Sequence, residues 1–465
     1  MLQQLTKARS LLTRACRVSL LAGLLLPLIG PAANADDSLA EEILRQRGAE
    51  FAQQIMKVSP GVYTAVGYSP ANISMIVGSD GVVIVDTGLN VAQASVVAAK
   101  FREITDKPVK AIIYTHGHGD HTGGAAAFIG DTKPQIWALA NFGAEDQPLA
   151  AAGLSIQRLR GARQAGFNLP DAQRINNGIA PAVRPGRANA FVADNTDTAP
   201  NHTFVAGRQA LEVAGLQLEL VAAPGETDDQ LYVWYPKQQV LFAGDNYYKS
   251  FPNLYAIRGT PYRDVFAWIQ SLNLMLEEQP AAVVPGHTRP IVGAELAAAG
   301  LRNHRDAIRY VHDKTVEGMN LGLGPDQLVE YVQLPASLAD NPDLGEYYGS
   351  VASAVRAIFT GYLGWYDGNP SQLSPLSPSE EARRWAQMLG GPEQLEKQAA
   401  AALQAGDSQW AAQLADQLLA LDPQDTRAKQ IKADALTALA HQSVNALARN
   451  YYLSVAQDLR GAQGN

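Results

Sequence analysis

One short segment of the chain gathers side chains that bind metal ions. Residues 115–121 read Thr-His-Gly-His-Gly-Asp-His, which places His116, His118, Asp120 and His121 within six positions. Imidazole and carboxylate groups suit zinc, and a nitrogen and oxygen set without thiolate is typical of a site that keeps one position open for water. Because three of the eight histidines of the chain lie here, a chance polar loop is the weaker interpretation. The segment predicts a metal site.

The elements before this segment would position it. The apolar run 109–114 predicts a buried strand, so the histidines lie on the loop that leaves its end. Upstream, the β-rich runs 73–77 and 82–85 are joined by Ser-Asp-Gly and predict a hairpin, and the spacing over 91–104 predicts a helix. Asp86 follows the hairpin. It either orients a ligand histidine or caps a turn, and the sequence leaves both readings open.

Three further candidate ligands follow apolar runs later in the chain. Glu226 lies in Pro-Gly-Glu-Thr, Asp245 follows Leu-Phe-Ala-Gly, and His287 follows Val-Val-Pro-Gly. Each therefore lies where a predicted strand passes into a loop, and there a rigid sheet can aim a side chain. Each motif is weak alone, and the order after the histidine segment is what makes them informative.

In this order the motifs resemble the metallo-β-lactamase superfamily. The resemblance implies an α/β fold, the αβ/βα four-layer sandwich, with the metals at one edge. Most members carry a histidine where this chain has Glu226. A carboxylate at that position resembles the alkylsulfatases of the superfamily, which complete one zinc site with glutamate.

The resemblance also implies how two zinc ions per subunit are held. The implied ligands are His116, His118 and Glu226 for one zinc, Asp120, His121 and His287 for the other, and Asp245 as the bridge. A hydroxide between the metals would be the nucleophile or base, because metal binding lowers the pKa of water to about 7. Asp120 is assigned a catalytic role as well as a ligand role.

A second segment narrows the substrate class. Residues 246–259 end in Ile-Arg-Gly and resemble the alkylsulfatase segment that ends in Leu-Arg-Gly, whose arginine contacts the sulfate. The resemblance assigns that role to Arg258, and a guanidinium offers a planar fork of donors to a tetrahedral oxyanion. The alternative is a loop arginine that pairs with Asp264 or another acid. Arg263 is a candidate second cation.

Residues between these segments supply further candidates. Asn201 matches an upstream family position that helps to bind sulfate, and His202 beside it is interpreted as structural or solvent-facing rather than a ligand. The weakly periodic stretch 142–200 corresponds to an insertion that shapes an apolar entrance in the alkylsulfatases. The alternative is that residues 142–200 form a surface segment with no role in the site.

Two features depart from the alkylsulfatase pattern. The family usually bridges its metals with glutamate, whereas Asp245 is shorter by one methylene, roughly 1.5 Å. The loop that carries Glu226 is also shorter than the family's Gly-Thr-Glu-Ala-Pro-Ala-Glu. Either difference would change metal spacing and substrate choice, so the alkyl chain length and the preference for primary or secondary esters stay open.

The chain begins with a predicted secretory signal. Basic residues precede the apolar run 18–29, and Ala-Asn-Ala at 33–35 predicts cleavage after Ala35, so residues 1–35 are assigned to a signal peptide. The only cysteine, Cys16, lies within it. We therefore expect a periplasmic or secreted protein with no membrane span after signal cleavage. The net charge of −8 argues against a nucleic-acid partner.

The remaining sequence divides into a catalytic domain at 36–300 and a helical domain at 301–465. Ser-Pro-Ser-Glu at 377–380 predicts a capped helix start. The strings at 362–370 and 406–411 resemble the helical dimerisation domain of alkylsulfatases, which implies a homodimer. Full-length family members usually add a small sterol-carrier-like lipid-binding domain. These residues do not include one, so substrate capture by such a domain is not expected.

Together these features predict a zinc-dependent hydrolase of small-molecule alkyl sulfate esters, of the linear primary type, that releases sulfate and an alcohol. They do not distinguish cleavage of the C–O bond from cleavage of the S–O bond. One alternative is hydrolysis of phosphoesters or β-lactams on the same scaffold. The other is a non-enzymatic exported interaction protein with a vestigial metal domain, which competent residues at all the ligand positions disfavour.

Overall fold

The computed structural model describes residues 35–130, 132–182 and 198–461. From Asp36 onward the chain forms one compact unit. Residues 1–34 of the predicted signal segment lie outside this description, as do residues 183–197 of the predicted insertion. Within the described ranges, no helix has the length and apolar character needed to cross a membrane.

The first half of the chain builds a seven-stranded sheet. In the described residues its strands follow chain order as β1 Gln54–Ser59, β2 Val62–Val66, β3 Ile73–Val77, β4 Val82–Val85, β5 Val109–Ile113, β6 Gln135–Leu139 and β7 His202–Phe204. β1 to β4 pair antiparallel, and β4 to β7 pair parallel. The predicted hairpin is confirmed as β3 and β4, and the strand predicted before the histidines is β5.

Helices cover the outer face of this sheet. The helices of this region are α2 Val91–Arg102, α3 Gly119–Thr122 and α4 Ala126–Ile129. α2 begins after Asn90, whose side chain accepts a backbone N–H of the first turn, and it ends two residues before the predicted position 104. Phe101 of α2 and Phe128 of α4 lie in one apolar cluster with Ile84 and Ile112 of the sheet. The predicted helix is therefore confirmed, and its buried face anchors it to β4 and β5.

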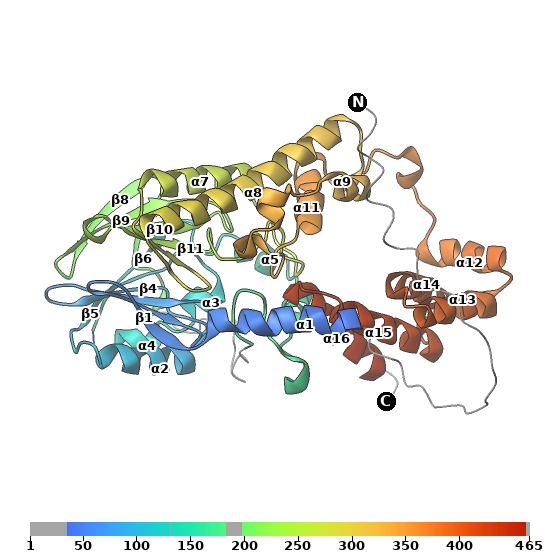
Figure 1. Ribbon diagram of the computed structural model, residues 1–465, viewed down its shortest axis with the longest axis horizontal. Helices are drawn as coiled ribbons and strands as arrows, with labels where there is room; N and C mark the ends of the chain where they lie inside the picture. Colours follow the sequence, from blue (N-terminus) through green and yellow to red (C-terminus); the bar gives the residue numbers. More distant parts are fainter. Residues whose placement is uncertain (1–34, 131, 183–197, 462–465) are drawn as a thin grey trace, which may run out of the picture. The chain divides into compact units, whose positions relative to one another are not determined.

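The second half of the catalytic region builds a six-stranded sheet. In the described residues its strands are β8 Arg208–Val213, β9 Leu216–Ala222, β10 Leu231–Tyr235, β11 Val240–Gly244, β12 Ala282–Pro285 and β13 Ile291–Val292, in the order β13-β12-β11-β10-β9-β8. Only the β11–β12 pair is parallel among these described pairs. The helices α7 Val265–Glu277 and α8 Ala294–Asn320 cover its outer face (Figure 1).

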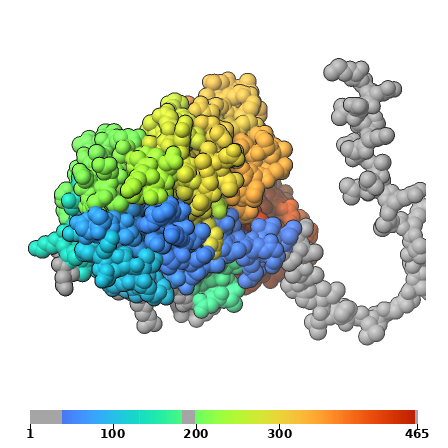
Figure 2. Space-filling view, turned by 60° about the vertical axis from the view of Figure 1, so that its left-hand side comes forward, coloured from blue at the N-terminus to red at the C-terminus, as the bar shows by residue number. Residues whose placement is uncertain are grey.

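A shared apolar core holds the two sheets together. Val83 and Ile113 of the first sheet lie in one buried cluster with Leu220 and Phe242 of the second. β10 and β11 are buried along their whole length because a sheet covers one face and helices cover the other. The predicted αβ/βα sandwich is confirmed. Figure 2 shows one face on which the first half, in blue, lies against the second, in green and yellow.

Helices make up most of the rest of the described chain. The α-helices not yet named are α1 Ala35–Arg47, α5 Asp146–Ala151, α6 Ile156–Gln164, α9 Pro325–Tyr331, α10 Ala336–Ala339, α11 Val351–Leu363, α12 Pro378–Leu389, α13 Pro392–Gln404, α14 Ser408–Leu421, α15 Thr426–His441 and α16 Ala446–Gly461. Short 3-10 turns are η1 Gly48–Phe51, η2 Asp171–Gln173, η4 Pro236–Gln238, η5 Pro342–Leu344 and η6 Pro370–Gln372. After α8, every described helix or strand up to Gly461 is helical, as predicted for this part of the chain.

Two sequence predictions concern this helical region. The predicted start at 377–380 is confirmed, because the Ser377 side chain caps α12 by accepting a hydrogen bond from Glu380 N. The predicted domain boundary between residues 300 and 301 falls inside α8, which continues unbroken to Asn320. A single helix thus belongs to both the sandwich and the start of the helical region.

The last helix contacts the insertion beside the sandwich. Asn450 of α16 donates a hydrogen bond to the backbone oxygen of Gln164 at the end of α6, and Arg163 of α6 pairs with Asp458 of α16. The side-chain oxygen of Gln164 in turn accepts the backbone N–H of Arg258 at 3.0 Å. The C-terminal helices therefore help to fix the backbone of the residue predicted to contact sulfate.

Candidate metal centre and anion pocket

The predicted ligands come together at one end of the sandwich. The parallel register pairs Val85 with Ile113 and Phe242 with Val284, so the loops after β4, β5, β11 and β12 leave the same ends of their sheets. His116, His118 and Asp245 offer ligand atoms that all lie within 4.8 Å of one another, and Asp120, His121 and His287 form a second such group. These two groups separate the ligands as the sequence resemblance implies, apart from Glu226.

Asp245 lies between the two groups. Its Oδ1 is 3.3 Å from His121 Nε2, and its Oδ2 is 3.2 Å from His287 Nε2 and 3.8 Å from His116 Nε2. Gly286 makes this approach possible, because a Cβ atom at that position would lie 2.1 Å from Asp245 Oδ1. The Asp245 carboxylate therefore lies within 4 Å of histidine nitrogens of both groups, and its role as a bridge stays a prediction.

Each of the four clustered histidines has a partner for the ring nitrogen that faces away from the cluster. These contacts are Thr115 Oγ1 to His116 Nδ1 at 3.0 Å, Glu145 Oε1 to His118 Nε2 at 3.3 Å, Asp86 Oδ2 to His121 Nδ1 at 2.8 Å, and the Pro70 oxygen to His287 Nδ1 at 2.8 Å. Partners of this kind set the tautomer and orientation of histidines that bind metal. The arrangement leaves one nitrogen of each ring directed at the cluster.

Asp86 satisfies both interpretations that the sequence left open. Its backbone has φ +56°, and its Oδ1 accepts the backbone N–H of Thr115 at 2.8 Å. Its Oδ2 accepts from Thr115 Oγ1 and lies 2.8 Å from His121 Nδ1. One carboxylate therefore caps the start of the histidine loop and orients His121.

The cluster carries unsatisfied polar atoms that fit a metal. Of the buried side-chain atoms without a hydrogen-bond partner in the described residues, three lie in this site: His121 Nε2, Asp245 Oδ1 and Glu226 Oε2. Buried polar atoms are normally paired, and all three belong to predicted ligands. A donor set of imidazole nitrogen and carboxylate oxygen fits zinc. The residues present therefore fit the implied metal.

The electrostatics of the cluster favour a bound cation. Burial alone would raise the pKa of Asp245, but His287 and His121 hold that pKa well below its ordinary range. Burial alone would lower the pKa of His121, but Asp245 and Asp86 raise it well above its ordinary value. The carboxylates thus attract positive charge to the centre of the cluster, where a proton and a divalent metal compete for the same ligand atoms.

Glu226 lies beside the cluster and is buried. Its Oε1 accepts a hydrogen bond from Arg263 Nη1 at 2.8 Å, while its backbone N–H donates to Asn246 Oδ1. The two close groups of potential ligands do not include it. Its free Oε2 is the atom available to a metal, and its role as a ligand stays a prediction.

Arg258, Arg263 and Glu145 form a charged cluster next to the predicted metal ligands, and this cluster is called the anion pocket. Arg258 Nη2 donates to Glu145 Oε1 at 2.7 Å and lies 3.2 Å from His118 Nε2. Arg263 donates from Nη1 to the backbone oxygen of Asn253, and its Nη2 lies 3.8 Å from Glu145 Oε2. Arg263 Nε and Nη2 are buried without a hydrogen-bond partner in the described chain. A guanidinium donor of Arg258 therefore lies beside a ring nitrogen of the predicted ligand His118, and one of Arg263 beside the carboxylate of the predicted ligand Glu226.

Glu145 is the member of this pocket that the sequence analysis missed. Burial alone would raise the pKa of its carboxyl group, but His118, Arg263 and Arg258 hold that pKa far below its ordinary range. The residue follows β6, so its position after a strand was the available signal. The alternative prediction, that Arg258 pairs with an acid, is met by Glu145 rather than by Asp264.

Asn201 lies away from this pocket. Its Oδ1 accepts the backbone N–H of Ile136 at 2.8 Å, and its own backbone N–H donates to the Ile136 oxygen. It therefore joins the beginnings of β6 and β7, whereas Glu145 follows the other end of β6. Its predicted contact with sulfate is not favoured by this position. His202 is exposed beside Trp137, with ring centroids 4.9 Å apart, as its structural interpretation predicts.

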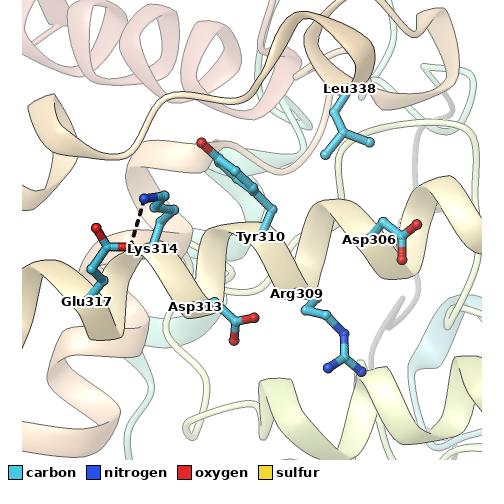
Figure 3. Close-up of a pocket in the computed structure, with 7 residues that line it drawn as sticks. All are labelled: Asp306, Arg309, Tyr310, Asp313, Lys314, Glu317 and Leu338. Carbon is cyan, nitrogen blue, oxygen red and sulfur yellow. Dashed lines mark hydrogen bonds and ion pairs between the residues drawn. The ribbon is translucent and has the colours of Figure 1, made fainter.

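A separate hollow of about 330 Å³ follows one face of α8. Its lining residues are Asp306, Arg309, Tyr310, Asp313, Lys314, Glu317 and Leu338 (Figure 3). Acidic and basic side chains alternate along it, and Lys314 pairs with Glu317 at 2.7 Å. It shares no residue with either group of potential metal ligands. The candidate metal site therefore lies at the end of the sandwich and not in this hollow.

Comparison with known proteins agrees with the fold and the site. Residues 66–287 match the metallo-beta-lactamase superfamily, and residues 324–462 match the alkyl sulfatase dimerisation family. The sandwich and its histidine cluster thus define a protein of the metallo-β-lactamase superfamily.

Individual relatives show which family within the superfamily the chain belongs to. A linear primary-alkylsulfatase of a Pseudomonas species is 38% identical over 398 residues, which are 83% of this chain and 74% of that protein. An (R)-specific secondary-alkylsulfatase of Pseudomonas is 30% identical over 92% of this chain and 66% of its own length. The solved structure of the stereoselective inverting sec-alkylsulfatase Pisa1 from Pseudomonas has a TM-score of 0.83 at 30% identity, covering 90% of this chain and 68% of that one. The chain belongs to the alkylsulfatase family.

Proposed function

We propose that this protein is a dizinc hydrolase of alkyl sulfate esters, which converts an ester and water into an alcohol and sulfate. The observation that carries the proposal is the position of Arg258, whose Nη2 lies 3.2 Å from a ring nitrogen of the predicted ligand His118. That nitrogen, Nε2, faces away from the cluster, so the guanidinium lies one imidazole ring away from the predicted metal site, where it can bind a tetrahedral oxyanion beside His118. The names of the relatives support the same substrate class, and the 38% identical relative supports the linear primary type.

The residues of the site take distinct roles in this proposal. The residues that would hold the zinc ions are His116, His118, Glu226, Asp120, His121, His287 and Asp245. When bound, the zinc pair supplies a water of lowered pKa and stabilises developing negative charge. Arg258 binds the sulfate oxygens through its planar fork, and Arg263 adds a second positive charge behind it.

Asp120 is the carboxylate of the cluster best placed to handle a proton. Its side chain is 29% exposed, compared with 4% for Asp245, and its Oδ2 lies 3.5 Å from His287 Nε2. It therefore reaches both the cluster and the solvent side. We assign to Asp120 Oδ2 the acceptance of a hydrogen bond from the attacking water, in addition to its role as a ligand.

The proposal includes the assembly and location of the protein. The match of residues 324–462 to the alkyl sulfatase dimerisation family supports a homodimer through the helical region. The basic and apolar pattern of residues 1–35 supports export to the periplasm or beyond. The proposed substrate is a small-molecule alkyl sulfate ester.

Sulfate release from dodecyl sulfate tests this function. We expect the zinc-loaded protein to release inorganic sulfate, and Arg258→Ala to lose at least about a hundredfold in kcat/KM, because it removes a charge-assisted contact to the anion. Arg384→Ala is the matched control, since Arg384 is exposed and pairs with Glu380 of the same helix, α12. No release from a folded, zinc-loaded protein would discard the sulfatase, and phosphoesters and β-lactams would then be assayed.

A further inference from the structure

Glu145 places a carboxylate where the two arginines would meet a substrate anion. Its Oε1 accepts a hydrogen bond from Arg258 Nη2 at 2.7 Å, and its Oε2 lies 3.8 Å from Arg263 Nη2. The side chains of Glu145 and Arg258 are 8% and 17% exposed. An incoming sulfate group must therefore share these donors with an acid that already belongs to the protein.

The position of Glu145 is built by the loop that carries Glu226. Asp229 of that loop accepts the backbone N–H of Gly143 at 2.7 Å, and the Asp228 backbone oxygen accepts from Asn141 Nδ2 at 3.0 Å. These bonds hold the short segment between β6 and α5. The chain that leads to Glu145 is thus held by contacts outside the arginine pair, while its carboxylate contacts His118 and the two arginines.

The charges of the anion pocket balance within the protein. Arg258 and Arg263 contribute two positive charges, and Glu145 and Glu226 contribute two negative charges. A sulfate ester carries one negative charge, whereas a phosphate monoester of the same alcohol carries two above its second ionisation. The second charge of the phosphate would face the Glu145 carboxylate across the shared guanidinium donors, where little water screens the repulsion.

We propose that Glu145 is a specificity-determining residue, which makes the pocket favour a monoanionic sulfate ester over a dianionic phosphate monoester. This inference rests on the proposed function, because it assigns Arg258 to the substrate anion. Glu145 would weaken binding of every anion, but it would weaken a dianion more than a monoanion. The effect of Glu145 is therefore measured by the ratio of the Kd of a dianionic ligand to the Kd of a monoanionic ligand, rather than by either Kd alone.

A matched pair of unreactive ligands tests the ratio. Octanesulfonate and octylphosphonate share one alkyl chain, and at a pH above the second ionisation of the phosphonate they carry one and two negative charges. Calorimetry on the zinc-loaded protein gives Kd for each. We expect the wild-type protein to prefer the sulfonate, and Glu145→Gln to reduce the ratio of phosphonate Kd to sulfonate Kd by at least about tenfold, as expected for removing one unit charge at short range.

Three controls make the result specific. Glu103→Gln removes an equal charge from an exposed residue that pairs with Lys100, and its ratio should equal that of the wild type. Glu145→Asp keeps the charge, and its ratio should stay within about threefold of the wild type by the same Coulomb argument. Zinc content and thermal unfolding, measured for each variant, separate a change of charge from loss of metal or fold.

Several outcomes would overturn the inference. A ratio that Glu145→Gln leaves unchanged, in a protein that binds octanesulfonate and hydrolyses dodecyl sulfate, removes the role of Glu145 while the proposed function stands. If Glu145→Asp changes the ratio as strongly as Glu145→Gln, the charge of Glu145 is not the cause, and the inference is likewise overturned while the proposed function stands. A wild-type protein that binds neither ligand and releases no sulfate would overturn the inference and the proposed function together.

Discussion

The Glu226 carboxylate and the Arg263 guanidinium form an ion pair inside the protein. Glu226 Oε1 lies 2.8 Å from Arg263 Nη1, and the two side chains are 1% and 2% exposed. Such a pair adds little net stability because both groups lose water, but removal of one partner strands the other charge. The buried carboxylate of Glu226 is therefore paired with a buried cation, which Arg263 supplies.

Replacement of Arg263 should destabilise the metal-free protein. We expect Arg263→Met to lower the free energy of unfolding by about 3–5 kcal/mol, because the Glu226 carboxylate is left buried and unpaired. Urea unfolding of chelator-treated protein measures the change. The double variant Arg263→Met/Glu226→Gln should recover much of the loss, because it removes both charges. A single-variant loss below about 1 kcal/mol would show that the pair carries no such energy.

Asp86 should control zinc affinity through His121. Asp86→Asn replaces a carboxylate that accepts from His121 Nδ1 with an amide, and partners of this kind typically change metal affinity by about 10–100-fold. Competition with a chromophoric chelator measures the affinity of the purified protein. Asp80→Asn, at the exposed turn between β3 and β4, is the control and should bind zinc as the wild type does. Equal affinity in both variants would contradict the orienting role.

His304 should make the fold sensitive to acid. It is buried beside the rings of Tyr247, Tyr248 and Trp268, at centroid distances of 5.2, 5.7 and 6.3 Å. Burial lowers the pKa of His304 to about 3, whereas an unfolded histidine has a pKa of about 6.5. Between these values the unfolded chain binds more protons than the folded one. The stabilising contribution of neutral His304 is therefore present above about pH 6.5 and is lost as the pH falls toward 3.

Urea unfolding at two pH values tests this effect. Between about pH 7.5 and about pH 5, His304 should account for about 2 kcal/mol of the loss of stability. The loss should be smaller by that amount in His304→Leu, whatever the absolute stability of the variant. An equal loss in both proteins would show that His304 takes up no additional proton on unfolding.

The sequence was most informative where one local pattern decided the outcome. His116 was singled out by the spacing of the histidine segment and Asp245 by its order after that segment, and the parallel register brings the ends of the two preceding strands together. Glu145 was missed because its importance depends on Arg258, more than a hundred residues away, and on the loop that folds Gly143 onto Asp229. Long-range contacts of this kind leave no periodic signal in the chain.

Two other differences have physical causes. Asn201 was assigned to the site by position in a motif, but its amide is used to join β6 to β7. The boundary at residue 300 was placed where the predicted structure becomes nearly all helical, whereas α8 keeps a continuous buried face across it that includes Leu301, Ile308 and Val311.

Zinc titration with sulfate as the readout tests the central claim most directly. Chelator-treated protein would be mixed with increasing zinc, and inorganic sulfate released from dodecyl sulfate would be measured by ion chromatography. The account predicts no release without metal and a rise that levels off at two zinc ions per subunit, because both groups of ligands must be filled. Release that is independent of metal, or no release from folded protein carrying two zinc ions, would contradict it.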